Sequence, residues 1–237
     1  MDEIGEFVDQ RQYAWCIHCG QGVAGLTTSR DHVPSRTLLQ EPFPENLPLV
    51  RICAPCNNGF SADEEYMAAF LGSVLAGTTE PDRQRFAAAG RILERSAKLR
   101  ARIEAAKTEY TTRGGETRFV WKPECERVNR VIVKNARGHA FFEYGEPMLS
   151  EPASVWCAPL ERLTEHQRHH FENVDMASGW PEIGSRMMTR VLTGQDLADG
   201  WVIVQDGVYR YSVAQAGVLL VRSVLFEYLA TEVHWSE

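Results

Sequence analysis

The chain lacks several features that would assign it to a common class of protein. Although 44% of its 237 residues are hydrophobic, it has no apolar run long enough to span a bilayer. It also has no phosphate-binding glycine loop, no nucleotide-binding motif, no internal repeat and no low-complexity tract. We therefore expect no membrane insertion, no P-loop chemistry and no repeat architecture. A chain of this length forms one or two domains.

The first ten residues lack the pattern of a secretory signal peptide. Asp2, Glu3, Glu6 and Asp9 stand where such a peptide has a basic and then an apolar region. We therefore expect a cytoplasmic protein. Because thiols stay reduced in the cytoplasm, the six cysteines are expected to bind metal or to remain free rather than to form disulfides.

Four of the cysteines form two pairs with the spacing of zinc knuckles. They are Cys16 and Cys19 in the first pair, and Cys53 and Cys56 in the second. Two such pairs supply the four sulfur ligands that tetrahedral Zn²⁺ takes in structural sites. We therefore expect one structural zinc. His18 is expected to be a side chain of the first knuckle loop, because four sulfurs already fill the coordination shell.

The loop between the two pairs carries a second group of polar residues. Asp31 is followed directly by His32, Asn46 precedes a leucine, and Asn57 follows the last cysteine. This segment, from residue 16 to residue 66, resembles the HNH endonucleases, whose ββα-metal core has an acid-histidine pair, a central asparagine and a ligand after the second knuckle. The resemblance implies that His32 is the general base and that Asn46 braces the loop that holds it. It also implies that Asp31 and Asn57 bind the catalytic cation.

One position departs from the commoner family pattern. The last ligand of the family is often histidine, and here it is Asn57, which makes the chain an HNN-type variant. An amide oxygen is a harder and weaker ligand than an imidazole, so we expect a labile Mg²⁺ or Mn²⁺ as the catalytic ion. Asn58 is the alternative ligand if the turn is offset by one residue. Asn46 is alternatively a simple turn residue after Pro42 and Pro44.

The resemblance implies metal-dependent hydrolysis of phosphodiester bonds in DNA that leaves a 5′-phosphate and a 3′-hydroxyl. Histidine suits the role of general base because its ordinary pKa of about 6.5 lies near neutral pH. Stand-alone members of the family often serve as effectors in antiphage defence or in mobile elements, and a similar role is expected here. Two alternatives stay open, a catalytically inert zinc-stabilised nucleic-acid-binding module and a scaffold protein with a purely structural zinc.

Acidic residues follow the second knuckle. Residues 61–64 have the form of a capping box, which predicts that a helix begins there. Asp63, Glu64 and Glu65 would then complement the dipole at the start of the helix, which is a structural role. A contact of Asp63 or Glu65 with His32 or with the catalytic ion is the functional alternative.

The net charge of the chain is −7, but the basic residues are concentrated in its middle third. There Pro81 and a run of apolar residues in steps of three and four predict one long amphipathic helix, within the segment 78–113. A basic stripe repeats with the same steps beside the apolar seam and consists of Arg91, Arg95, Lys98 and Arg102. We expect this stripe to bind the phosphate backbone of nucleic acid, with a solvated surface or a dimer interface as alternatives.

Residues 114–237 predict a mixed α+β structure without a chemical motif. Strands are expected at residues 118–121, 201–205, 208–211, 218–226 and 233–235, and a helix at residues 124–138 that ends at its glycine. Asp206 and Gly207 are the strongest hairpin signal in the chain. Three histidines share helical spacing without a third type of ligand nearby and are expected to face solvent: His166, His169 and His170.

Together these patterns predict an α+β protein in three segments. A zinc-clamped HNH core with a ββα-metal fold occupies residues 1–77, the long basic helix residues 78–113, and an α+β region with an antiparallel hairpin residues 114–237. The expected partner is DNA. The long helix or the C-terminal region is expected to form a homodimer or to bind another protein.

Overall fold

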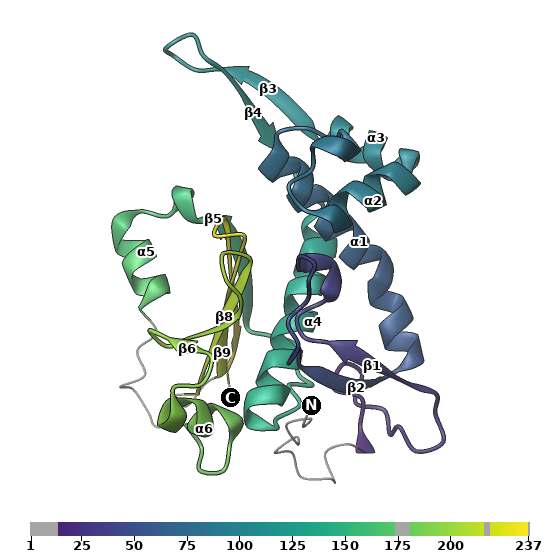
Figure 1. The fold of residues 1–237 in the computed structure, drawn as a ribbon, viewed down its shortest axis with the longest axis vertical. Coiled ribbons are helices and arrows are strands. Elements are labelled where there is room, and N and C mark those ends of the chain that lie inside the picture. The colour runs from purple at the N-terminus through teal and green to yellow at the C-terminus, as the bar shows by residue number, and fades with distance from the viewer. Residues whose placement is uncertain (1–13, 174–180, 216–218, 237) are drawn as a thin grey trace.

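The computed structural model describes residues 14–173, 181–215 and 219–236. Within them the chain is a mixed α+β protein with antiparallel sheets, as predicted. An N-terminal unit consists of the antiparallel strands β1 (Thr28–His32) and β2 (Leu49–Cys53) and the helix α1 (Ala54–Ala76). Figure 1 shows this unit on one side of α4 (Cys125–Tyr144) and the C-terminal sheet on the other. Among the described helices none is long and apolar enough to cross a membrane.

Helix α1 begins at Ala54, directly after β2, and not at Ser61 as the capping-box pattern predicts. Pro55 in the first turn favours this start because its fixed φ and missing N–H suit that position. Asn57 therefore lies in the first turn of the helix. The acidic residues of the pattern lie in the middle of α1, too far from its start to complement the dipole, and they pair with cations of other helices instead.

The prediction of one long helix in residues 78–113 is wrong. The segment forms a 3₁₀ turn (Pro81–Arg83), α2 (Ala87–Arg95), α3 (Ala97–Ala105) and the first strand of a hairpin. The break lies at Ser96, whose backbone is not helical (φ −122°, ψ 84°) and whose hydroxyl accepts a hydrogen bond from the N–H of Leu99 at 3.3 Å. Serine competes for backbone donors in this way, so it ends α2 and caps α3. The basic stripe is consequently divided between two helices.

Strands β3 (Lys107–Thr111) and β4 (Thr117–Trp121) form an antiparallel hairpin that projects from one end of the molecule (Figure 1). The strand predicted at residues 118–121 is confirmed. Gly115 lies in the connecting turn with a φ of +83°, a conformation that glycine adopts without strain. Tyr110, which lies within the segment predicted as one long helix, is a strand residue.

Helix α4 continues through Gly138, where the sequence predicts its end, and stops before Gly145, whose φ is +76°. Gly138 permits a close contact instead of ending the helix. A Cβ atom at this position would lie 2.6 Å from Cγ2 of Val33. Because Val33 directly follows His32 in the chain, this contact brings α4 against the end of β1.

The C-terminal half contains a six-stranded antiparallel sheet in the order β5-β10-β9-β8-β7-β6. Its strands are β5 (Ser154–Pro159), β6 (Leu197–Ala198), β7 (Trp201–Gln205), β8 (Tyr209–Gln215), β9 (Leu219–Leu225) and β10 (Leu229–Trp235). The hairpin predicted around residues 206 and 207 is confirmed, as are the strands predicted near 218–226 and 233–235.

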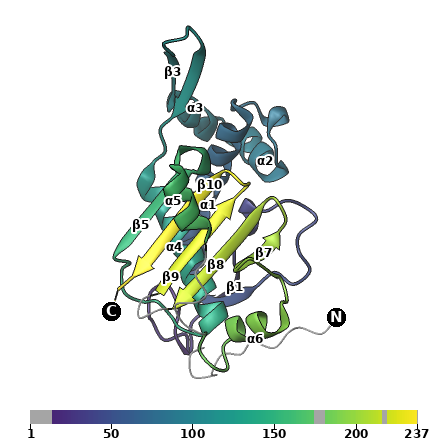
Figure 2. The same ribbon diagram turned by 90° about the vertical axis from the view of Figure 1, so that its left-hand side faces the viewer.

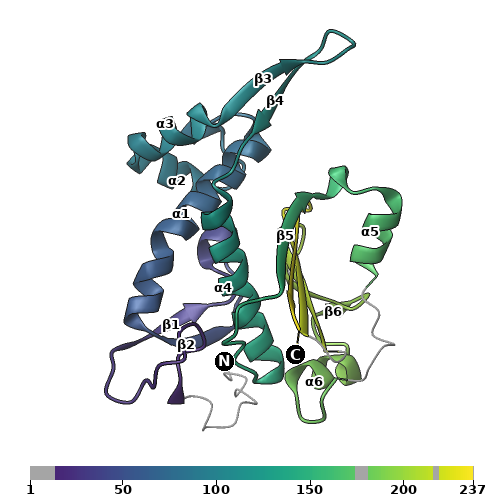
Figure 3. The same ribbon diagram turned by 180° about the vertical axis from the view of Figure 1, so that it is seen from behind.

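Helices cover both faces of this sheet. Figures 2 and 3 show α4 against one face and α5 (Glu165–Glu172) against the other, and α6 (Arg186–Thr193) packs beside α4. The three histidines of α5 are exposed, as predicted: His166, His169 and His170.

One cluster of buried side chains runs through α1, α4 and the sheet, so the three predicted segments share a hydrophobic core. Buried polar contacts cross the same interfaces. Tyr211 of the sheet and Arg190 of α6 both donate to the carboxylate of Glu143 of α4, whose side chain is fully buried. His139 of α4 lies with its Nε2 3.0 Å from the hydroxyl of Tyr209. These contacts fix α4 against the sheet.

Replacing Gly138 by alanine should destabilise the protein because the new Cβ would overlap Val33. We expect a loss of about 1–3 kcal/mol in the free energy of unfolding, measured by urea denaturation. Gly59→Ala is the matched control, because position 59 also lies inside a helix and a Cβ there meets nothing within 4 Å. It should stabilise the protein by up to about 1 kcal/mol. Equal effects of the two substitutions on stability would contradict the assigned contact. Adding Val33→Ala to Gly138→Ala should recover part of the lost stability, and no recovery would also contradict the contact.

Candidate functional site

The four knuckle cysteines converge on one point. Cys16 and Cys19 lie in the segment before β1, Cys53 ends β2, and Cys56 lies in the first turn of α1. Their sulfur atoms all lie within 4.8 Å of one another, and those of Cys19 and Cys53 are 3.8 Å apart. Tetrahedral Zn–S bonds of about 2.3 Å place sulfurs roughly 3.8 Å apart, whereas a disulfide needs about 2.05 Å. The cluster can therefore hold a metal ion such as zinc, in agreement with the prediction from spacing.

The electrostatics of the thiols also favour a cation. Burial raises the pKa of the Cys56 thiol strongly, and the neighbouring sulfurs of Cys53 and Cys16 raise it further. Burial also raises the pKa of Cys16, but hydrogen bonds from backbone N–H groups outweigh burial and lower it, among them one from Cys53 at 3.5 Å. A divalent ion would neutralise the accumulated negative charge and let all four thiols ionise.

Asp31 is held by a buried lysine that was not predicted from the sequence. Lys134 of α4 is 3% exposed, and it donates to Asp31 Oδ1 at 2.8 Å, to Ser35 Oγ at 2.8 Å and to Glu64 Oε1 of α1. These three acceptors use all three donors of the ammonium group. Burial alone would raise the pKa of the Asp31 carboxyl, but the charge of Lys134 and its hydrogen bond to Oδ1 oppose this effect, and the pKa is lowered. Asp31 is therefore ionised at neutral pH.

His18 of the first knuckle is the other neighbour of Asp31. Its Nε2 lies 4.0 Å from Asp31 Oδ2, too far for a hydrogen bond, and neither of these buried atoms has a hydrogen-bond partner within the described residues. The ring meets Phe60 of α1 edge-on, with 4.8 Å between the centroids. Burial lowers the pKa of His18, so its imidazole is neutral near pH 7. A neutral imidazole nitrogen and a carboxylate oxygen that face each other can hold a divalent cation between them.

Asn57 lies on the face of α1 that borders this pair. It precedes Phe60 and Glu64 by three and seven positions, and helical residues at this spacing share a face. Phe60 and Glu64 contact the two neighbours of Asp31 described above. Asn58 is exposed and lies about 100° further round the helix. The geometry therefore favours Asn57 over Asn58 as a ligand near Asp31.

His32 is the last residue of β1 and is half-buried. Successive strand residues point to opposite faces, so His32 shares the outer face of the hairpin with Arg30, whereas Asp31 faces the helices. Burial and then the positive charge of Arg36 lower the pKa of His32, and the opposing effect of Asp31 is smaller. The imidazole is consequently neutral at neutral pH, which is the form that accepts a proton.

Asn46 lies in an exposed turn before β2. Its side chain makes no hydrogen bond in the part of the chain that the structure describes. No contact is therefore seen through which it would brace the loop of His32. The bracing role stays a prediction, and the placement fits the alternative of a simple turn residue.

Three of the four cations in the predicted basic stripe form ion pairs. They are Arg91 with Glu41, Arg95 with Glu65, and Arg102 with Glu124. The three arginine side chains are 59%, 66% and 56% exposed, and such surface pairs add little stability. Lys98 is exposed and has no ion-pair partner within the described ranges. The carboxylates reduce the positive charge that the stripe offers to phosphate, and its role in binding nucleic acid stays a prediction.

Two of the acidic residues after the second knuckle, Asp63 and Glu64, join α1 to α4. Asp63 accepts from Arg127 at 2.5 Å and from Arg130 at 2.6 Å, and Glu64 binds Lys134. A sequence signal for these contacts exists on α4. Lys134 and the buried Asn135 interrupt the apolar face of that helix, and polar residues at buried helical positions indicate a specific partner.

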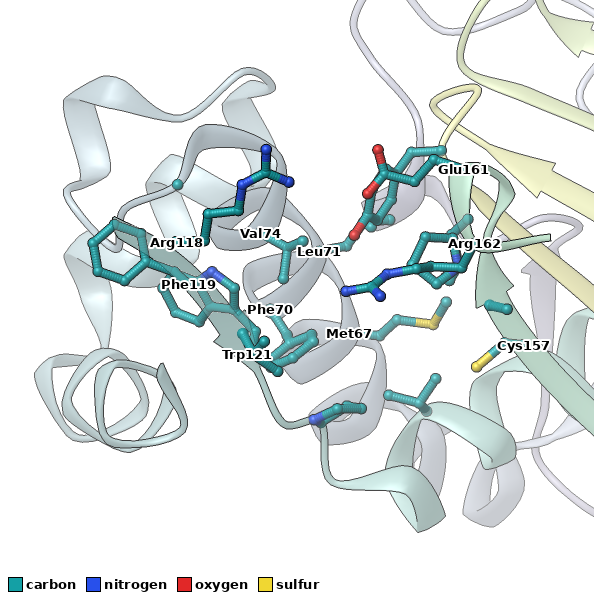
Figure 4. A pocket seen from close by; sticks show the side chains of 18 of the residues that line it. Met67, Phe70, Leu71, Val74, Arg118, Phe119, Trp121, Cys157, Glu161 and Arg162 are labelled. Atoms are coloured by element: carbon teal, nitrogen blue, oxygen red, sulfur yellow. The ribbon is translucent and has the colours of Figure 1, made fainter. Parts of the chain in front are cut away.

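An apolar cleft of about 600 Å³ lies between α1, the β3–β4 hairpin and β5 (Figure 4). Phe70 and Trp121 line one side, and the guanidinium of Arg162 points into the cleft from the other. Its described lining residues include no histidine, and it lies toward the C-terminal end of α1, away from Asn57. The cleft is therefore separate from the candidate site.

Comparison with known proteins found no matching family model, no matching curated protein and no matching solved structure. The resemblance to the HNH endonucleases accordingly rests on the residues of the segment from the first knuckle to α1.

Replacing Lys134 by methionine should strongly destabilise the protein because the carboxylates of Asp31 and Glu64 would lose their cation. We expect a loss of about 3–5 kcal/mol in the free energy of unfolding, measured by urea denaturation. The exposed Lys98→Met is the matched control and should change stability by less than about 0.5 kcal/mol. Adding Glu64→Gln to Lys134→Met should recover part of the loss, since it removes one unpaired charge. A Lys134→Met protein as stable as the parent would disprove the assigned ion cluster.

Proposed function

We propose that the chain is a metal-dependent endonuclease of HNH type that hydrolyses phosphodiester bonds in DNA, with His32 as the general base. The observation that supports this most is the placement of Asp31 and His32 at the end of β1, within a hairpin and helix unit that also holds the four-cysteine cluster. An effector role in antiphage defence or in a mobile element is the proposed setting. The reducing cytoplasm, where four thiolates persist, is the proposed location.

The proposal assigns different roles to two ions. Zn²⁺ in the four-cysteine cluster would be structural, because four sulfurs complete its shell and leave no position for substrate. A labile ion would lie at Asp31 and Asn57. The donors fit such an ion, since Asp31 Oδ2 is a buried acceptor without a hydrogen bond in the described chain and His18 Nε2 faces it. A carboxylate, an amide oxygen and an imidazole suit Mn²⁺ as well as Mg²⁺.

Residues of the chain supply the general base and position the carboxylate that would hold the ion. Neutral His32 takes a proton from a water molecule while the oxygen of that water attacks phosphorus. The bond from phosphorus to the 3′ oxygen breaks, solvent protonates the departing oxygen, and the water oxygen stays on the 5′-phosphate. Lys134 fixes one oxygen of Asp31, so the other is oriented before substrate binds. The phosphate would lie across the end of β1, where Asp31 and His32 are adjacent in the chain. A divalent ion held by Asp31 there would stabilise the negative charge that develops on the phosphate and on the departing oxygen.

His32→Ala should lower the rate of plasmid cleavage by about 10²–10⁴-fold, since this is the usual contribution of a general base. Folding, zinc content and DNA binding should be retained. His166→Ala, which changes an exposed histidine of α5, is the matched control and should cut at the parental rate.

A His32→Ala protein that cuts as fast as the parent would remove His32 from the mechanism. Cleavage of RNA without cleavage of DNA would keep the reaction and change the substrate. If the parent cuts no nucleic acid with any divalent ion, the inert alternatives are favoured, a zinc-stabilised nucleic-acid-binding module or a scaffold protein.

Protein purified without chelators should contain one zinc ion per chain by elemental analysis, and Cys16→Ser should lose it. Because apparent binding energies at such sites are about 10–16 kcal/mol near neutral pH, the substitution should unfold the N-terminal unit and lower the melting temperature. Cys125→Ser is the control, since Cys125 is exposed and lies outside the cluster. Zinc-free parent protein, or a Cys16→Ser protein with parental melting, would refute the zinc assignment.

A further inference from the structure

Two arginines stand directly opposite each other on the β1–β2 hairpin. Arg30 of β1 is paired in register with Arg51 of β2, and both are exposed. Directly opposed residues of antiparallel strands have Cβ atoms about 4.5–5.5 Å apart, and like charges at this distance destabilise the sheet. The hairpin therefore holds two positive charges together against their mutual repulsion.

Neither arginine has an acidic partner among the residues that the structure describes. In the described ranges neither guanidinium forms an ion pair, a hydrogen bond or a ring contact. The arginines of the basic stripe differ in this respect, because Arg91, Arg95 and Arg102 are each bound to a glutamate. A guanidinium without a carboxylate is free to bind phosphate, whose oxygens match its fork of donors.

The opposed pair lies beside the candidate base. His32 is two residues beyond Arg30 on the same strand, and residues at this spacing share a face and lie about 6.6 Å apart. Arg36, in the 3₁₀ turn (Arg36–Leu38) that follows β1, adds a third cation, and its guanidinium lies 4.2 Å from the centroid of the Phe43 ring. Three arginines without a carboxylate partner in the described chain thus lie on the two strands and the turn next to His32, although the N-terminal segment is acidic as a whole.

We infer that Arg30 and Arg51 bind one phosphate of the DNA backbone and so position the neighbouring phosphodiester at His32. The inference rests on the proposed function for the identity of the phosphate. A phosphate between the two guanidinium groups replaces their repulsion with charge-assisted contacts. Such contacts carry no base information, so they act alike on every sequence. The two arginines are positioning residues, which we call the phosphate clamp.

The salt dependence of DNA binding tests the phosphate clamp. Both the Arg30→Gln/Arg51→Gln variant and its parent carry His32→Ala, which prevents cutting. Their affinities for a short labelled duplex are measured by fluorescence anisotropy. The slope of log affinity against log salt should become shallower by about 0.9, because the clamp neutralises one phosphate and each neutralised phosphate contributes about −0.9. The same slope corresponds to roughly eightfold per phosphate at 0.1 M salt, so the affinity should fall about eightfold.

Arg118→Gln/Arg168→Gln is the matched control. It removes the same formal charge from two exposed arginines that are bound to glutamates and lie outside the basic stripe, so the slope and the affinity should change much less. The melting temperature gives a second readout. Relief of the repulsion between Arg30 and Arg51 should leave the melting temperature unchanged or raise it by about 1–2 °C. If the two arginines stabilised the fold, the double substitution would lower the melting temperature.

An unchanged affinity and slope for Arg30→Gln/Arg51→Gln would overturn the phosphate clamp, as would a lowered melting temperature or a parent that does not bind DNA. Equal losses in the two double variants would also overturn it, because binding would then follow net charge alone. The outcome is separable from the proposed function. If DNA binding depends on the two arginines but the protein cuts nothing, the phosphate clamp is supported and the nuclease function is rejected. If the protein cuts DNA and the double variant binds DNA normally, the nuclease function is supported and the phosphate clamp is rejected.

Discussion

The buried ammonium group of Lys134 makes the contact on which the rest of this structure depends. A lysine that is 3% exposed is stable only when its charge and all three donors are satisfied, and Asp31, Ser35 and Glu64 together meet this condition. These partners belong to β1, to the segment after it and to α1, whereas the lysine belongs to α4. The contact therefore holds all of these elements in one arrangement, and Gly138 lets α4 approach closely enough to make it.

The N-terminal unit is anchored in two places by different chemistry. The four cysteines gather where β2 meets α1, and the lysine cluster holds the inner face of β1 near its other end. The outer face of the hairpin takes part in neither anchor, and it carries His32 and the phosphate clamp. Residues proposed to act on substrate are thus separated from those that hold the fold. Asp31 belongs to both groups, because one of its oxygens binds Lys134 and the other faces His18.

Features that depend on neighbouring residues were predictable from the sequence, and features that depend on distant contacts were not. The spacing of the cysteine pairs and the turn signal before β8 are local, and the structure agrees with both. Lys134 and Asp31 are 103 positions apart, and no pattern in either segment names the other. A glycine such as Gly138 commonly marks the end of a helix. The sequence does not show the contact with Val33 that explains this glycine instead. The apolar period continues through Ser96, although its hydroxyl breaks the helix. The number of basic residues likewise does not reveal which of them already have a carboxylate partner.

Cleavage of supercoiled plasmid, with Mg²⁺, Mn²⁺ or Ni²⁺ added and an EDTA control, tests the central claim most directly. The account predicts that the protein nicks and then linearises the plasmid only when a divalent ion is present. It also predicts that the new ends carry a 5′-phosphate and a 3′-hydroxyl, so that DNA ligase joins the nicks without prior treatment. Cleavage that persists in EDTA, nicks that ligase does not close, or the absence of cleavage with every ion would contradict it.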